Sequence, residues 1–143
     1  MSVPPARPLR IFLVGGEHSG DALGARLFMA LTAQRAGVSL RGVGGPRMTG
    51  AGLNSLFPMS DIAVIGPAAI IEHLPHLLRR IRETAQAAIE ASPDVVVIID
   101  APEFTHRVAR RIRRARPDLR IVNYVSPSVW AWRPWRARKM RAY

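Results

Sequence analysis

Two carboxylates in this 143-residue sequence stand where acid–base chemistry is expected, because each follows a short apolar run. Asp100 comes directly after Val95–Ile99 (VVVII), and Glu17 follows Leu9–Val14 (LRIFLV) and two glycines. A carboxylate at the open end of a dry strand is suited to general-base catalysis. Asp100 is therefore the candidate base, and Glu17 the candidate for binding sugar hydroxyls. The alternative is that Asp100 or Glu103 caps the following helix; we favour catalysis for Asp100 and capping for Glu103.

Small residues surround Glu17 in the stretch GGEHSGD, residues 15–21. Such residues let backbone N–H groups approach a ligand, and a helix that starts here favours an anion. Ser19 is a second candidate for substrate binding, although Ser19 or Asp21 capping that helix is an equally good interpretation. The spacing G-x-G-x-x-G is missing, so a dinucleotide site is not indicated.

Arg47 follows another glycine-rich strand end, in the stretch GGPRM at residues 44–48. A guanidinium at this place is suited to clamp a phosphate group. The alternative, which we favour for this stretch taken alone, is a tight turn with a solvated arginine.

The most specific stretch is SPSVWAWR, residues 126–133, in which two tryptophans lie beside two serines and an arginine. Tryptophan stacks on sugars or lines acyl pockets, while hydroxyl and guanidinium groups bind polar atoms. We select Ser126, Trp130 and Arg133 as candidate binding residues. A loop that buries its tryptophans at a domain interface is the alternative, and both roles are compatible.

The elements that must position these residues alternate between strand and helix patterns. Apolar runs predict strands at 9–14, 38–43, 54–57, 95–99 and 121–125, and helical spacing predicts helices at 21–31, 74–89 and 104–116. The β-branched run 95–99 is typical of a parallel strand buried on both faces. The order predicts an open, mostly parallel α/β sheet with helices on both faces, in a single domain over residues 1–143. Ligands bind such sheets at the carboxyl ends of the strands, where the candidate residues lie.

The net charge of +11 is concentrated at one end of the chain. Residues 1–106 carry nine arginines and nine acidic residues, whereas residues 107–143 carry twelve basic residues and one aspartate. Such an end indicates an anionic partner, or a surface completed by another domain. The basic stretch 133–143 begins like a helix with nothing to pack on it, so we expect one half of a larger two-domain protein.

Composition excludes several classes of protein. The absence of cysteine rules out a disulfide scaffold, a cysteine zinc site and thiol catalysis. The four histidines lack metal-ligand spacing, so we expect no metal. The sequence shows no secretory signal and no apolar run of about 20 residues, which predicts a cytoplasmic protein. The apolar stretch 62–78 followed by arginines fits either peripheral contact with an anionic membrane or an ordinary core helix.

Four of these stretches together resemble the lipid-A-disaccharide synthase family of inverting glycosyltransferases. They are GGEHSGD, GVGGPRM at residues 42–48, IDAPEF at 99–104 and YVSPSVWAWR at 124–133, and the resemblance covers residues 9–143. It implies the N-terminal, acceptor-side half of a GT-B architecture, which is two Rossmann-like halves around a cleft. The donor-binding C-terminal half is the implied missing partner.

The resemblance implies a reaction between two lipid sugars. A diacylglucosamine passes from its uridine diphosphate donor to 2,3-diacylglucosamine 1-phosphate, which gives a β-1,6-linked disaccharide 1-phosphate and uridine diphosphate. Asp100 would act as the base on the acceptor 6-hydroxyl. Glu17 and Ser19 would orient sugar groups, and a further set would contact the acceptor or the interdomain cleft: Arg47, Ser126, Trp130 and Arg133. No metal or other cofactor is implied, and the partners are the lipid substrates and the inner-membrane surface.

This sequence departs from the family pattern at a few places. Glu103 and Thr105 stand where the family usually has aspartate and asparagine, and Ala69 stands where it has glutamate. These departures, with the missing half, predict no turnover by the chain alone. The competing hypothesis is a non-catalytic module that binds anionic membranes or nucleic acid through its basic residues 107–141. The sequence shows no recognised nucleic-acid fold, so we expect no nucleic-acid partner.

Overall fold

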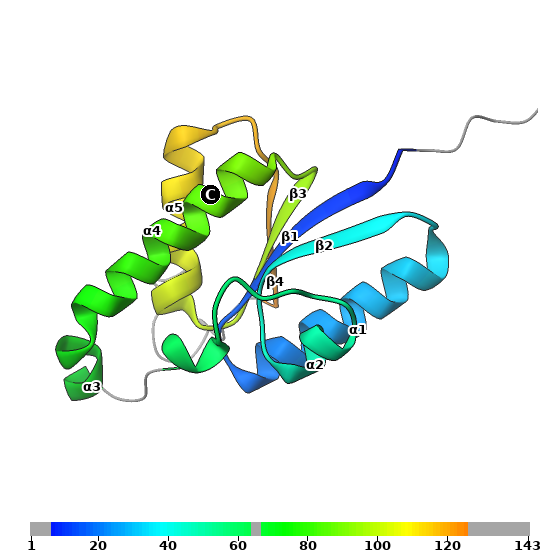
Figure 1. The fold of residues 1–143 in the computed structure, drawn as a ribbon. Helices are drawn as coiled ribbons and strands as arrows, with labels where there is room; N and C mark the ends of the chain where they lie inside the picture. The colour runs from blue at the N-terminus through cyan, green and yellow to red at the C-terminus, as the bar shows by residue number, and fades with distance from the viewer. Residues whose placement is uncertain (1–6, 64–66, 126–143) are drawn as a thin grey trace, which may run out of the picture.

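The computed structural model describes residues 7–63 and 67–125, and these form an α/β layer structure (Figure 1). The strands are β1 (Leu9–Gly15), β2 (Val38–Val43), β3 (Val95–Ile99) and β4 (Ile121–Tyr124). The helices are α1 (His18–Gln34), α2 (Pro46–Gly50), α3 (Pro67–Glu72), α4 (Leu74–Ala91) and α5 (Pro102–Ala115), with a 3-10 turn η1 (Met59–Asp61).

Within the described residues, the strands form one sheet in the order β2-β1-β3-β4, and every pairing is parallel. β1 is an internal strand of the sheet, because it pairs with β2 on one side and with β3 on the other. The predicted open, parallel α/β sheet is therefore confirmed. All carboxyl ends lie at the same edge, which faces downward in Figure 1.

Alternating side chains of the central strands face two separate cores. Phe12, Val14, Val96 and Ile98 pack under α4 and α5. Their neighbours Ile11, Leu13, Val97 and Ile99 pack under α1 and α2 on the other face. Because both faces are covered, apolar residues occupy every position of β3 and positions 11–14 of β1, which is the pattern expected of a doubly covered parallel sheet.

The predicted strand at 54–57 is wrong: this segment makes only one isolated parallel bridge, between Ser55 and Gly42. Leu53 is buried with α1 and α2, whereas Phe57 is buried with α4 and α5. The segment therefore crosses the open edge of β2 from one face of the sheet to the other. Its apolar residues anchor that crossing and do not extend the sheet.

α4 begins at Leu74 as predicted, whereas two other helices begin earlier than the sequence pattern predicted. α1 starts at His18 and not at Asp21, and α5 starts at Pro102, where proline suits the first helical position. The five-residue helix α2 was not predicted at all. No helix among the described residues is long and apolar enough to cross a membrane.

Candidate functional site

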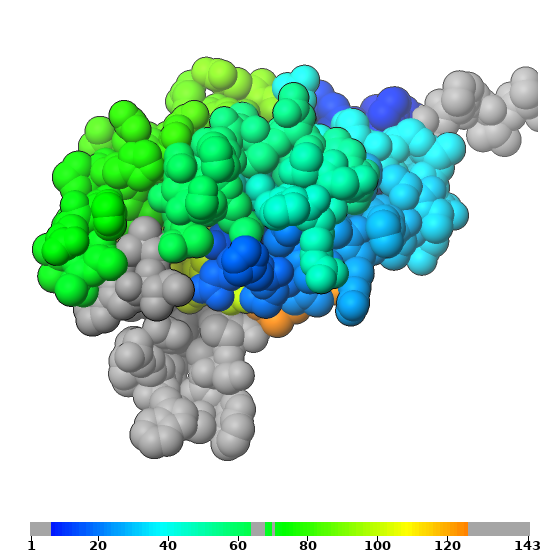
Figure 2. Space-filling view, turned by 60° about the horizontal axis from the view of Figure 1, so that its bottom comes forward, coloured from blue at the N-terminus to red at the C-terminus, as the bar shows by residue number. Residues whose placement is uncertain are grey.

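Asp100 and Ser19, predicted from separate motifs, meet at the carboxyl edge of the sheet. The Ser19 hydroxyl, in the first turn of α1, donates a hydrogen bond to Asp100 Oδ2. Asp100 is half-buried directly after β3, and Ser19 is exposed. Figure 2 views this edge, where the blue residues that follow β1 lie beside the yellow start of α5. The two residues thus form one polar unit that is open to solvent.

The turn that carries Asp100 has an unusual backbone. Asp100 and Ala101 have φ values of 57° and 43°, in the left-handed region that non-glycine residues rarely adopt. Such a conformation costs roughly 1–3 kcal/mol per residue and needs support from its surroundings. Buried Thr105 gives that support, because its hydroxyl donates to the Asp100 carbonyl at 2.8 Å. The threonine that departs from the family pattern therefore holds the backbone of the candidate base.

The loop after β1 packs closely on this turn. A Cβ atom on Gly16 would lie 2.3 Å from the Ala101 Cβ, so only glycine fits. Asp100 Oδ1 accepts the Ala101 N–H at 3.0 Å, so the carboxylate lies against the N-cap residue of α5. Gly16 of the GGEHSGD stretch therefore makes room for the strained turn.

Glu17 lies at the rim of a small hollow beside the same turn. The hollow has a volume of about 90 Å³ and is lined by Glu17, Ile62, Leu77, Ala101, Pro102, Glu103 and Phe104. Its floor is apolar, because Ile62, Leu77 and Phe104 are buried core residues. The exposed carboxylate of Glu17 stands beside this floor, at the first turn of α1, without capping that helix.

Asp21 is fully buried and caps a different helix from the one that contains it. Asp21 Oδ1 accepts the N–H groups of Gly45 and Met48, and Oδ2 accepts that of Arg47, each at 2.9 Å. A Cβ on Gly45 would lie 2.7 Å from Asp21 Oδ2, so the carboxylate also requires this glycine. Asp21 therefore joins the first turn of α1 to the start of α2.

The reason for this role lies at the start of α2. A helix leaves its first N–H groups without partners inside the helix. α2 begins with Gly45 as N-cap and Pro46 at the first position, so it has no side chain of its own to cap it. The acceptor must then come from elsewhere, and Asp21 is a buried carboxylate at the same edge of the sheet.

Arg47 is exposed at the start of α2, on the same edge as Asp100. Its backbone is fixed by Asp21, whereas its side chain makes no hydrogen bond or ion pair with the described residues. Arg47 is therefore a solvated arginine, as the favoured alternative predicts, and its guanidinium is available to a phosphate group. Ser126, Trp130 and Arg133 lie outside the described residues.

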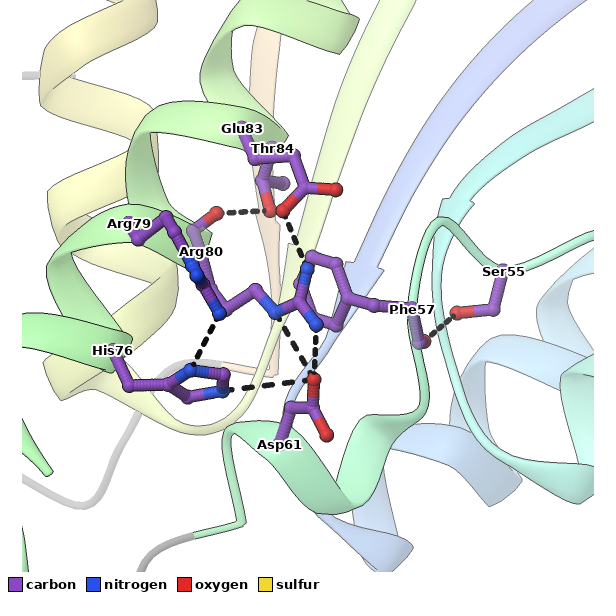
Figure 3. A network of polar contacts seen from close by, with 8 residues as sticks. All are labelled: Ser55, Phe57, Asp61, His76, Arg79, Arg80, Glu83 and Thr84. Carbon is purple, nitrogen blue, oxygen red and sulfur yellow. Dashed lines mark hydrogen bonds and ion pairs between the residues drawn. The ribbon is translucent and has the colours of Figure 1, made fainter.

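A polar network around Arg80 joins η1 to α4 (Figure 3). Arg80 of α4 binds Asp61 of η1 through Nε at 3.0 Å and through Nη2, and its Nη1 contacts Glu83 at 2.6 Å. Its guanidinium also lies 4.4 Å from the ring centroid of Phe57. The hydrogen bonds with Glu83 and Asp61 raise the pKa of Arg80, so the guanidinium stays charged.

This network connects the crossing segment to α4. Phe57 in turn packs edge-on against Phe104 with ring centroids 6.5 Å apart. Asp61 directly precedes Ile62, and Leu77 lies one turn before Arg80. The two apolar wall residues of the hollow are therefore held by residues at most three positions away.

Titratable side chains of the described residues gather near the hollow. No three His, Cys, Asp or Glu side chains group to hold a metal ion in the part of the chain that the structure describes. His76 contacts Asp61 at 3.6 Å and Arg79 at 3.0 Å, so it belongs to the polar network. Asp100 pairs with Ser19 beside the apolar-floored hollow.

Comparison with known proteins adds an independent line of evidence. The sequence profile of the lipid-A-disaccharide synthetase family matches residues 11–143. A lipid-A-disaccharide synthase of Nitrobacter hamburgensis is 58% identical over 135 residues, which covers 94% of this chain and 34% of that protein. Similar proteins of the same name occur in Nitrobacter winogradskyi, 55% identical over 99% of this chain and 36% of the relative, and in Ruegeria pomeroyi, 48% identical over 94% of the chain and 33% of the relative. The chain spans about a third of the length of these curated relatives.

The capping role of Asp21 gives a stability prediction. Asp21→Asn removes one acceptor oxygen and directs an NH₂ group at backbone donors, which leaves a buried N–H without a partner. We expect the free energy of unfolding to fall by about 2–3 kcal/mol, measured by urea denaturation. The matched control is Glu17→Gln, four positions earlier on an exposed side chain, for which we expect a change of about 0.5 kcal/mol or less. Equal losses in the two variants would contradict the capping role.

Proposed function

The chain belongs to the lipid-A-disaccharide synthetase family, and from this premise we propose that it forms the acceptor-binding half of an inverting glycosyltransferase. The complete enzyme would transfer 2,3-diacylglucosamine from a uridine diphosphate donor to 2,3-diacylglucosamine 1-phosphate. The products would be the β-1,6-linked disaccharide 1-phosphate and uridine diphosphate. Because this chain corresponds to a third of its relatives, we expect the 143 residues alone to be inactive.

The observation that carries this proposal is the pairing of Asp100 with Ser19 beside the apolar-floored hollow. Two family motifs that are 81 residues apart meet there at hydrogen-bond distance. A base needs to be held in place and open to its substrate, and Asp100 is both. The hollow offers apolar surface next to carboxylates, which suits one face of a sugar or the start of an acyl chain.

The proposed chemical step uses the Asp100 side chain as the general base. One carboxylate oxygen of Asp100 takes the proton of the acceptor 6-hydroxyl while the hydroxyl oxygen attacks the anomeric carbon of the donor. The bond from this carbon to the diphosphate oxygen breaks, and the electron pair leaves with uridine diphosphate. Attack from the side opposite the leaving group inverts the anomeric centre. Each carboxylate oxygen accepts one hydrogen bond, Oδ2 from Ser19 and Oδ1 from the Ala101 N–H, so the group is held in place and keeps lone pairs for the proton.

The other candidate residues would bind and orient. Glu17 stands at the rim of the hollow, where it can accept hydrogen bonds from sugar hydroxyls. Arg47, whose guanidinium is exposed on the same edge, would bind the acceptor phosphate. We assign Ser126, Trp130 and Arg133 to the acceptor and the interdomain cleft on the strength of their motif alone. The donor would be held by a second half, and no cofactor takes part.

The same proposal includes contact with the cytoplasmic surface of the inner membrane, where such lipid substrates would lie. Ile71 of α3 is 73% exposed, and Leu74 and Leu78 of α4 are each 36% exposed. Arg79 and Arg82 are exposed beside them. Apolar side chains next to arginines suit the interface of an anionic membrane.

The role of Asp100 is tested by substitution in a full-length transferase that contains this chain. Asp100→Asn keeps the shape of the side chain and removes its basicity. We expect turnover to fall by roughly a hundredfold or more, with little change in KM, because only proton transfer is impaired. The measurement is release of uridine diphosphate, with the disaccharide product quantified by mass spectrometry.

The matched control is Glu90→Gln, which neutralises an exposed carboxylate on α4. It should leave turnover and KM unchanged. If Asp100→Asn retained near-normal turnover while remaining folded, Asp100 would not be the base.

The membrane contact is tested with anionic vesicles. Ile71→Ser removes an exposed apolar side chain, and burial of isoleucine contributes about 2 kcal/mol. We therefore expect vesicle affinity in a sedimentation assay to fall by about tenfold or more. Met29→Ser on α1, where the residue is 57% exposed, is the control and should have little effect. Equal binding by the Ile71 variant and the unsubstituted chain would contradict this part of the proposal.

A further inference from the structure

A second concave surface lies at the amino edge of the sheet, away from Asp100. It is a groove of about 560 Å³ between the starts of β1, β3 and β4. These strand starts face upward in Figure 1, whereas the candidate site faces downward. Five arginines line the groove: Arg7, Arg10, Arg35, Arg116 and Arg120. We call this surface the amino-edge groove.

Two aspartates in the amino-edge groove balance only part of this charge. Asp94 binds the Arg7 guanidinium at 2.6 Å, and Asp118 binds Arg116 through two contacts of 2.9 and 2.8 Å. The hydrogen bond from the Arg10 backbone N–H lowers the pKa of Asp94 most, and the hydrogen bond from the Arg7 side chain lowers it further. The Asp94 carboxyl is therefore ionised at neutral pH. The hydrogen bond from Arg116 likewise lowers the pKa of Asp118.

The remaining arginines leave an excess of three positive charges in the groove. The Arg10 Nε lies 4.0 Å from Asp94, at the limit of an ion pair. Arg35 donates to the carbonyl of Arg7 at 2.9 Å, which fixes its position without neutralising its charge. Arg120 is exposed and forms no ion pair with the described residues. Arginines from three separate chain segments, residues 7–10, 35 and 116–120, thus converge on one hollow.

Part of this arrangement is held rigid before any ligand arrives. Arg116 is clamped by Asp118 and also donates to the Ser92 hydroxyl at 3.0 Å. Asp94 accepts the Arg10 N–H at 2.8 Å, which ties the start of β3 to β1. A pre-formed set of guanidinium groups loses less conformational entropy when it binds an anion, and its planar forks match phosphate oxygens.

The shape and the lining favour a small anion over a membrane. The volume lies in the range of ligand pockets, about 300–1,000 Å³. None of the large exposed apolar side chains of the described residues lines the groove. A concave surface rich in arginine and without exposed apolar anchors suits an ion that enters it, and does not suit a flat lipid surface.

We propose that the amino-edge groove is a binding site for a small, multiply charged phosphate anion of the di- or triphosphate class. Three unbalanced guanidinium groups match such a ligand better than a single phosphate. The inference rests on the charges and the shape of this edge and is independent of the transferase proposal, because the groove shares no residue with the Asp100 site.

The test is calorimetric titration of the 143-residue chain with sodium tripolyphosphate, and with orthophosphate, at low salt. We expect tripolyphosphate to bind more tightly, and added salt to weaken it because exposed charges are screened. Arg120→Gln and Arg35→Gln should each weaken binding by about fivefold. Asp118→Asn should strengthen it by about threefold, because it removes a competing carboxylate and releases Arg116.

Asp118→Asn separates a binding effect from a folding effect, because a variant that loses its fold would not bind tripolyphosphate more tightly. Arg26→Gln, at an exposed arginine on α1, is the matched control and should change nothing. The proposal is overturned by absence of binding, by an equal loss in Arg26→Gln, or by weaker binding in Asp118→Asn. Circular dichroism of each variant confirms its fold.

Two further titrations identify the source of the phosphate. The probes are phosphatidylcholine vesicles with about a third phosphatidylglycerol, and a short DNA duplex. If Arg120→Gln lowered vesicle or duplex binding and left tripolyphosphate unaffected, the groove would bind a macromolecular surface and the proposal would be wrong. Loss of tripolyphosphate binding with unchanged vesicle binding would support it.

Discussion

The buried carboxylate of Asp21 is the interaction on which the candidate site depends. It lies in the first turn of α1, yet its hydrogen bonds go to Gly45, Arg47 and Met48 after β2. Two residues earlier in the same turn, Ser19 binds Asp100 after β3. The start of α1 is thus the point at which the ends of three parallel strands are joined. Three backbone N–H groups accepted by one buried carboxylate make that junction specific, because no neutral side chain of similar size replaces it.

The same junction explains why glycine and a strained turn stand at this edge. Gly45 leaves room for Asp21, and Gly16 leaves room for Ala101. The left-handed backbone at Asp100 turns its carboxylate back toward the helix start, and Thr105 fixes the carbonyl behind it. Strain of this kind persists where the surroundings determine the conformation, and it is concentrated at functional sites. Gly16, Gly45 and Asp21 are therefore residues that the packing at this edge requires.

The parallel sheet and the motifs at its strand ends could be predicted from the sequence, but the contacts between these motifs could not. The run Val95–Ile99 is apolar at every position, so a strand covered on both faces was predictable. The predicted strand at 54–57 is wrong because this segment crosses the sheet edge, with Leu53 and Phe57 buried on opposite faces. The apolar residues of such a crossing follow neither a strand nor a helix periodicity. The cap of α2 by Asp21 and the binding of Asp61 by Arg80 join residues far apart in the chain. Contacts of this kind depend on the tertiary arrangement, and residue spacing does not report them.

The direct test is a structure of a full-length transferase that contains this chain, with 2,3-diacylglucosamine 1-phosphate bound. We predict that the acceptor 6-hydroxyl oxygen lies about 2.6–3.2 Å from an Asp100 carboxylate oxygen, with its sugar over the hollow beside Glu17. An acceptor bound elsewhere, with that hydroxyl out of reach of Asp100 even through one bridging water, would contradict a catalytic role for this edge of the sheet.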